Sequence, residues 1–306
     1  MATKIIKRRT QRLAANPIGY WNHGSKADTS RERFSEAFRE LRDIGFTAVK
    51  ADIPGGMTAT EYADWIGSYG LAPSLSLFNS SFDDSVEIVE VLEEAKIFAA
   101  GQLALGLDRT MISSVWVPAR MERPAVGADF NGARLRLAIE NVGRVCEVFK
   151  AEGLRPLLHS HVGGVFETEA EVTLLLDTLG KELIGFGPDT GHLRWAGMDP
   201  EAMIRRYADR IGGIHIKDCF ADYLEPAASE GMSYQDLGES RRLWAEPGSG
   251  VVDFEAIVAA MPADYDGDYM IEIDVPSVIS LYDSHSMSFA WATKALAGVN
   301  IQRKTQ

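Results

Sequence analysis

The chain has little cysteine and no long apolar segment. Its 306 residues include only two cysteines, Cys146 and Cys219, which are too few for a disulfide framework and favour a reducing compartment. No run of 18 or more apolar residues occurs, which excludes a typical membrane-spanning helix. The first residues are charged and lack the apolar segment of a secretory signal. We therefore expect a cytoplasmic protein with no membrane partner.

The chain is also poor in positive charge. It has 31 Lys and Arg residues against 44 Asp and Glu residues, which gives a formal net charge of −13. Proteins that bind nucleic acid usually carry a basic stripe, and the main basic run here is Lys4–Arg12. A basic arm is one interpretation of this run. We expect residues 1–13 to be a solvated leader instead, and we predict no nucleic-acid partner.

What the chain has is a regular alternation of strand-like and helix-like segments. Strands are expected at 13–21, 46–51, 71–78, 102–107, 155–158, 183–187, 211–217 and 269–273. Helices are expected at 34–44, 58–69, 83–100, 130–151, 167–179, 200–208, from 252 onward, and at 282–297, with long loops at 108–128 and 219–250. Eight strand–helix units without a linker-like break predict an α/β protein, a single-domain (β/α)₈ TIM barrel over residues 14–300.

Four of the expected strands end in residues that ligate metal ions. His159 and His161 end the fifth strand, and both should point the same way because alternate strand residues share a face. Asp189, His215 and Glu272 end the next three strands. Each residue alone would be better explained as a cap or a satisfied core residue. Their recurrence predicts one site at the carboxyl ends of the strands, where barrel active sites lie.

The set His159, Asp189, His215 and Glu272 offers two imidazoles and two carboxylates. This mixture suits a divalent ion, and we expect Mn²⁺ or Co²⁺, with Fe²⁺, Zn²⁺ or Mg²⁺ as alternatives. His161 is placed as well as His159 to supply the first imidazole. A structural metal, or none, is the competing interpretation, but ligands at a barrel mouth favour a catalytic ion over a closed structural cage.

The sequence resembles the xylose-isomerase-like TIM barrel superfamily of sugar isomerases and epimerases, and within it the inosose dehydratases. The matching stretches span nearly the whole chain: Asn16-Pro17-Ile18-Gly19, His159-Ser160-His161-Val162-Gly163-Gly164, Asp189-Thr190-Gly191-His192, Asp209-Arg210-Ile211, His215-Ile216-Lys217-Asp218, Pro247-Gly248-Ser249-Gly250-Val251-Val252-Asp253-Phe254 and Glu272. The resemblance implies that Asp189, His215 and Glu272 are metal ligands. His159 stands where the epimerases usually carry a ligating Glu, which implies the dehydratase side of the superfamily.

Three stretches depart from the inosose dehydratase pattern. After the first strand this chain has Gly19-Tyr20-Trp21-Asn22-His23, where those enzymes usually show Gly-Trp-Thr/Ser-Asn-Asp. The segments 111–128 and 222–246 do not match either. Loops at these positions shape the pocket of a barrel, so the departures leave the substrate open while the predicted chemistry stands.

The predicted residues permit proton removal next to a ketone. A metal ion would stabilise the enolate, with His161 as the first choice of base and Glu272 as the second. Lys217 and His192 are the predicted acids for the leaving group, although a salt bridge for Lys217 and a helix-end contact for His192 explain them equally well. Substrate contacts are expected from four further residues: Arg194, Trp195, Trp244 and Glu246. For Trp195, packing in the core is an equally good explanation.

These observations favour a metal-dependent carbon–oxygen lyase. Its substrate would be a small keto-cyclitol such as inosose, or a 3-keto-sugar or 3-keto-glycoside that loses water or an alkoxide. The alternative is a metal-dependent sugar isomerase or epimerase, which would reprotonate the same enolate. A metal-free barrel that only binds its ligand is the distant alternative. A homo-oligomer is possible for each of them.

Overall fold

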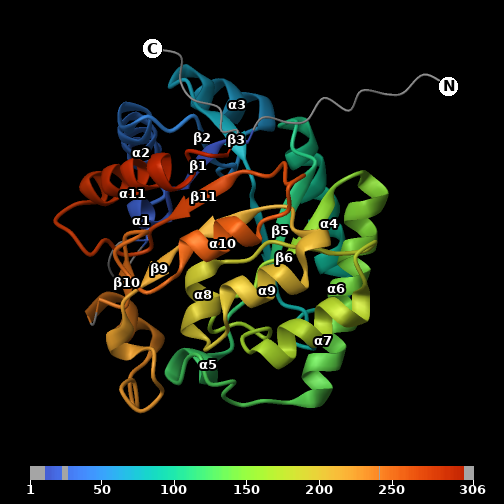
Figure 1. Ribbon diagram of the computed structural model, residues 1–306. Coiled ribbons are helices and arrows are strands. Elements are labelled where there is room, and N and C mark those ends of the chain that lie inside the picture. The colour runs from blue at the N-terminus through green and yellow to red at the C-terminus, as the bar shows by residue number, and fades with distance from the viewer. Residues whose placement is uncertain (1–10, 23–26, 241, 300–306) are drawn as a thin grey trace.

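A computed structural model describes residues 11–22, 27–240 and 242–299. Parallel strands lie at the centre of the molecule and helices lie around them (Figure 1). The central strands are β1 Leu13–Asn16, β2 Ala48–Lys50, β3 Ala72–Ser74, β4 Leu77–Ser80, β5 Arg109–Ser114, β6 Arg155–Leu158, β7 Gly185–Phe186, β8 Ile214–Ile216 and β11 Tyr269–Glu272. They form two sheets with the orders β3-β2-β1-β11-β8 and β4-β5-β6-β7.

The two sheets join into one barrel at two seams. At the first, the chain bends between β3 and β4, so that β3 pairs with β2 and β4 pairs with β5. At the second, isolated parallel bridges join Phe186 to Ile211 and Asp189 to His215. The segments β3 and β4 together therefore make one bent barrel strand, and the predicted single-domain (β/α)₈ TIM barrel is confirmed. The first ten residues of the predicted leader, and position 300 at the predicted domain boundary, lie outside the described residues.

The helices cover the barrel on the outside. They are α1 Ile18–Trp21, α2 Arg31–Ile44, α3 Ala59–Ser68, α4 Ile88–Ala104, α5 Pro118–Glu122, α6 Gly132–Glu152, α7 Glu169–Leu179, α8 Thr190–Trp195, α9 Pro200–Arg206, α10 Phe254–Ala260 and α11 Leu281–Ala295. Ser30 caps α2, and Thr58 forms a capping box with Glu61 at α3. Across the described part of the chain, no helix has the length and apolarity needed to cross a membrane.

Apolar side chains close the barrel interior beneath the carboxyl ends of the strands. This inner cluster consists of Ala14, Ala48, Leu75, Met111, Leu157 and Met270. Leu157 leaves no room for a neighbouring side chain, because a Cβ on Gly212 would lie 2.5 Å from its Cδ2. The packed interior gives the polar residues above it a fixed floor.

The predicted fourth strand is wrong in position. Residues 102–104 continue helix α4, and the strand is β5, Arg109–Ser114, inside the segment that we expected to be a loop. The sequence of β5 is mostly polar, yet all six residues are buried. Its polar groups find partners within the barrel, since Thr110 Oγ1 donates to Ser76 O at 3.0 Å and Arg109 pairs with Asp266 at 2.6 Å.

Two further predictions need correction. The first strand ends at Asn16 and does not reach residue 21, because Pro17 cannot donate to the sheet and a turn of helix, α1, follows. The predicted loop 219–250 contains an antiparallel pair, β9 Asp218–Cys219 with β10 Trp244–Ala245. The carboxylate of Asp218 accepts four backbone N–H groups at 2.8–3.0 Å, from Cys219, Gly248, Gly250 and Val252. The buried Asp218 side chain therefore fixes both ends of the segment that leaves the barrel after β8 and returns before α10.

Candidate active site

The residues predicted to be metal ligands converge at the carboxyl ends of four adjacent strands. His159 follows β6, Asp189 follows β7, His215 lies on β8 and Glu272 ends β11. One ligand atom from each of His159, Asp189 and His215 lies within 4.8 Å of the others. The Nδ1 atom of His215 is 2.7 Å from Glu272 Oε2 and 3.6 Å from Asp189 Oδ2. The structure thus brings all four side chains together.

Several atoms of this cluster suit a cation. Asp189 Oδ2 is buried and has no hydrogen-bond partner among the residues the structure describes, whereas His215 Nδ1 is ion-paired with Glu272 Oε2 at 2.7 Å. Asp189 Oδ1 is already used, because it accepts the His192 N–H at 2.8 Å and caps helix α8. His159 Nδ1 lies 3.0 Å from Gly187 O, so this nitrogen carries the proton and Nε2 keeps a free lone pair. Buried ligand-type atoms without partners fit a divalent ion.

Electrostatics set the protonation states of the cluster, and His159 and Glu272 are already in the states that a metal requires. Burial, helped by His215, lowers the pKa of His159 to about 3, so this imidazole is neutral. Burial would raise the pKa of Glu272, but Lys217 and His215 outweigh it and hold that pKa well below its usual range. Burial would lower the pKa of His215, but the charges of Glu272 and Asp189 raise it to about 9, so His215 is protonated and an ion bound there would replace that proton. The same negative charge would attract a cation to this position.

His161 lines the same cavity as His159, with its ring centre 6.3 Å from that of His159. Its Nδ1 lies 2.7 Å from Val162 O, which fixes the proton there and leaves Nε2 as an acceptor. Burial, with a smaller effect from Lys217, lowers the pKa of His161 to about 4. The ring lies 6.1 Å from that of Tyr234 and within 16° of parallel to it. His161 is therefore a neutral, oriented imidazole at the cavity surface.

Lys217 has no free proton to offer. It is 1% exposed, and its ammonium donates to Glu272 at 2.8 Å, Asp274 at 2.6 Å and His192 Nε2 at 3.1 Å. These contacts use all three N–H groups. Trp244 covers the ammonium, with its ring centre 4.2 Å from Nζ. Neither Lys217 nor His192 lines the cavity, so the geometry makes them supports for Glu272 and Asp274.

The cavity above the inner cluster has a volume of about 340 Å³. Its floor and walls include residues that the sequence prediction missed, namely Asn16, Lys50, Trp116, Met121, Tyr234 and Asp274. Asn16 donates to Glu272 Oε2 at 2.5 Å and keeps a buried Oδ1 without a partner among the described residues. Lys50 pairs with Asp52 at 3.0 Å. The signal for three of them was available, since Asn16, Lys50 and Asp274 all lie at or just beyond strand ends.

Residues 38–294 match the sequence model of a family described as xylose isomerase-like TIM barrel. The chain belongs to this family. The resemblance inferred from the strand-end motifs is thereby confirmed, together with the barrel fold.

One curated protein and two solved structures show what this chain is similar to. Inosose dehydratase of Geobacillus kaustophilus (strain HTA426) is 23% identical over 284 residues, which cover 90% of this chain and 92% of the relative. A xylose isomerase-like TIM barrel protein from Mycobacterium smegmatis in complex with magnesium superposes with a TM-score of 0.69 at 17% identity, covering 94% of this chain and 97% of that one. The IolI protein with a binding zinc atom superposes with a TM-score of 0.67 at 13% identity, covering 94% and 99%. The structural likenesses show the fold.

The residues predicted to contact substrate in this xylose isomerase-like barrel divide into two groups. Trp244 lines the cavity. Trp195 lies behind it, packed 4.9 Å from Tyr234 and 5.3 Å from Trp244 between ring centres, which agrees with its packing alternative. Arg194 is half-buried and does not line the cavity. Glu246 lies outside as well, because its carboxylate accepts hydrogen bonds from Ser277 and Ser284.

Replacing Lys217 by methionine is expected to lower the free energy of unfolding by roughly 3 kcal/mol, since Glu272 and Asp274 would keep their buried charge without its cation. Chemical denaturation of the metal-free protein measures the effect. Lys181→Met is the matched control, because Lys181 pairs with Asp209 on the surface and should change stability little. Equal effects of the two substitutions would contradict a supporting role for Lys217.

Proposed function

We propose that the protein is a divalent-metal-dependent carbon–oxygen lyase that acts on a ketone, either a keto-cyclitol such as inosose or a 3-keto-sugar. The observation that carries the proposal is the cluster of His159, Asp189, His215 and Glu272, which lies beside His161 at one cavity and leaves the buried Asp189 Oδ2 without a hydrogen-bond partner among the described residues. Relatives named inosose dehydratase support the reaction class, and they align with 84% or more of this chain in several cases.

The four clustered side chains would hold the ion. His159 would use Nε2, Asp189 would use Oδ2, and His215 and Glu272 would supply the remaining ligands. A divalent ion bound there supplies a Lewis acid for the negative charge that develops on the substrate's ketone oxygen. Its identity is proposed as Mn²⁺ or Co²⁺, with Fe²⁺, Zn²⁺ and Mg²⁺ as alternatives. A protein that only binds its ligand and holds no metal would have no use for the buried carboxylates of Asp189 and Glu272, which argues against the metal-free alternative.

His161 would remove the proton from the carbon next to the ketone. Its Nε2 is free because Nδ1 is committed to Val162 O, and it lies at the cavity surface. Glu272 is the second choice of base, because its two oxygens already contact Lys217, Asn16 and His215. A base with one free, oriented lone pair is the better acceptor of a proton.

The leaving oxygen needs a proton from a group that lines the cavity. Lys217 and His192, the acids predicted from the sequence, do not line the cavity and are hydrogen-bonded to one another. Lys50 and Asp274 line the cavity and can carry a proton, so we propose them as the acids. Lys217 then acts as a positioning residue that holds Glu272 and Asp274 in place.

The test is a product analysis with and without metal. Protein freed of metal by a chelator should be inactive towards keto-cyclitols and 3-keto-glycosides, and Mn²⁺ or Co²⁺ should restore turnover. NMR should then detect an α,β-unsaturated ketone. A rearranged or epimerised sugar would instead assign the isomerase alternative, since the same enolate would have been reprotonated. Failure to bind any divalent ion in a metal analysis would contradict the proposal altogether.

A further inference from the structure

Trp116 is an aromatic side chain that the packing of the protein does not explain. It is 55% exposed, yet it lines the cavity. Its ring centre lies 6.4 Å from that of His161 and 6.1 Å from that of Tyr234. A buried tryptophan normally contributes to stability. Because Trp116 is only about half buried and lies beside the proposed base, a contribution to stability does not explain its position.

Met121 extends the same wall. A Cβ on Gly163 would lie 2.7 Å from Met121 Sδ and 3.3 Å from Trp116 Cδ1, so both side chains pack over this glycine. The sulfur of a methionine and the faces of aromatic rings are well suited to contact another aromatic ring. Trp116, Met121 and Tyr234 thus form one apolar wall, which we call the aromatic wall, next to His161.

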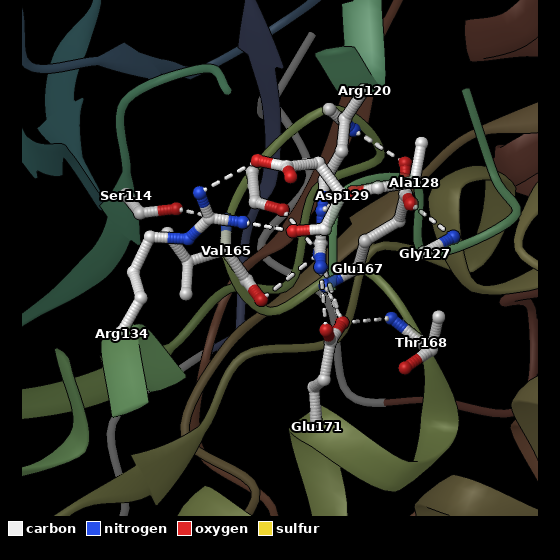
Figure 2. A network of polar contacts seen from close by, with 12 residues as sticks. Ser114, Arg120, Gly127, Ala128, Asp129, Arg134, Val165, Glu167, Thr168 and Glu171 are labelled. Carbon is white, nitrogen blue, oxygen red and sulfur yellow. Dashed lines mark hydrogen bonds and ion pairs between the residues drawn. The ribbon is translucent and has the colours of Figure 1, made fainter. Parts of the chain in front are cut away.

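A buried ion pair between Arg120 and Glu171, shown in Figure 2, holds the segment that also contains Trp116 and Met121. Arg120 and Glu171 form two hydrogen bonds at 2.6 and 2.9 Å, and both side chains are 2% exposed. The same guanidinium donates to the carbonyl oxygens of Ala128, Gly164 and Val165. The contacts with Gly164, Val165 and Glu171 join the segment after β5 to the segment after β6, and the contact with Ala128 lies within the segment after β5.

Glu167 makes a second set of ties in the same network (Figure 2). Its carboxylate accepts the N–H groups of Ala125, Gly127 and Gly163 at 2.8–2.9 Å. The backbone is held in the left-handed region at Ala125, with a φ of 64°, which costs energy for a residue with a side chain. The segment that carries Trp116 and Met121 is therefore fixed before a ligand arrives, and a preorganised surface loses less entropy on binding.

We propose that the aromatic wall binds an aromatic group of the substrate, carried on the carbon next to the one that loses its proton. This inference rests on the proposed function and narrows its substrate class to 3-keto-glycosides with an aryl-bearing aglycone. In β-elimination the deprotonated carbon and the carbon that bears the leaving oxygen are neighbours. A substrate placed with its α-proton at His161 therefore directs its aglycone towards a neighbour of His161, and Trp116 is such a neighbour.

The step is balanced without a further reactant. The C–H bond breaks and its proton passes to His161, and the electron pair forms the enolate. The enolate then forms the carbon–carbon double bond as the C–O bond to the aglycone breaks. The released alkoxide takes up one proton and leaves as an alcohol, and the sugar part leaves as an enone.

The test compares two glycosides whose leaving alkoxides have similar basicity. These are the 2-phenylethyl and ethyl 3-keto-glucosides, and calorimetry measures their affinity for the full chain with and without Mn²⁺. We expect the phenylethyl compound to bind about tenfold more tightly to the wild type. Trp116→Ala should abolish this difference by weakening the binding of the phenylethyl compound, whereas Trp116→Phe should preserve most of the difference. Phe130→Ala is the matched control, because Phe130 is 64% exposed and does not line the cavity.

The outcomes separate this inference from the proposed function. Equal affinity for the two glycosides, or a preference that survives Trp116→Ala, would overturn the aromatic wall as a binding site. A 3-keto-disaccharide that binds more tightly than the phenylethyl compound would also overturn it, in favour of a second sugar. If the phenylethyl preference depends on Trp116 but neither glycoside is cleaved, the inference stands and the lyase proposal fails.

Discussion

Replacing Asp189 by asparagine is expected to lower turnover by at least about 10³-fold while the barrel stays folded. The asparagine keeps Oδ1, which caps helix α8 through the N–H of His192, and Asn is as good a cap as Asp. It replaces Oδ2, the buried oxygen without a partner among the described residues, by an NH₂ group that cannot ligate a cation. The variant therefore removes one proposed ligand atom and little else, and losses of this size follow from removing a charge-stabilising group.

Asp199→Asn provides the matched control. Asp199 caps helix α9 by accepting the N–H groups of Glu201 and Ala202, and it is exposed and outside the cavity. The Asp199→Asn variant should leave both turnover and metal content unchanged. Turnover is measured with added Mn²⁺, metal content by elemental analysis and folding by circular dichroism. An Asp189→Asn variant that retains its metal and wild-type turnover would show that the ion, if any, binds elsewhere.

The second large effect distinguishes the two histidines that end the fifth strand. His161→Ala should keep the metal and the substrate affinity but lose about 10²–10⁴-fold in kcat, the range attributed to a general base. It should also lose the exchange of the substrate's α-proton in D₂O. His159→Ala should lose metal affinity instead, because the free Nε2 of His159 faces the ligand cluster while its Nδ1 is held by Gly187.

The opposite pattern has a definite meaning. Loss of metal in His161→Ala, with metal retained in His159→Ala, would exchange the two roles and make Glu272 the more credible base. Full activity in both variants would place the base elsewhere in the cavity, and Asp274 and Lys50 would then be tested in the same assay. Either result would leave the barrel and its strand-end cluster unchanged.

The sequence predicted the barrel and its ligand cluster because both depend on short-range patterns. His159, Asp189, His215 and Glu272 each follow a strand closely, and parallel strands end at the same edge. The position of β5 could not be read in the same way, because a short apolar run fits a helix end and a strand equally well. Residues 102–107 contain good helix formers, and α4 continues into them.

The remaining differences arise from contacts between distant segments. The polar strand β5 resembles a loop until its partners Ser76 and Asp266 are known, and neither is near in sequence. Lys217 was predicted to be an acid, with a salt bridge as the alternative, and in the fold it forms ion pairs with Glu272 and Asp274, which the sequence did not indicate as its partners. Trp116 attracted no role from the sequence, since an isolated aromatic residue in a presumed loop has no periodicity to interpret.

The four hydrogen bonds of Asp218 have a consequence for how this protein can diversify. They clamp the chain where it leaves the barrel after β8 and where it returns at Gly248–Val252. A Cβ on Gly250 would lie 2.3 Å from Asp218 Oδ1, so the return point tolerates little variation. Between these two ends, Leu237 and Leu243 are buried in the core, whereas positions such as Asp222 and Glu225 are exposed. We expect the exposed positions to vary while the strands keep their register, so that new selectivity can be acquired there without altering the reactive groups.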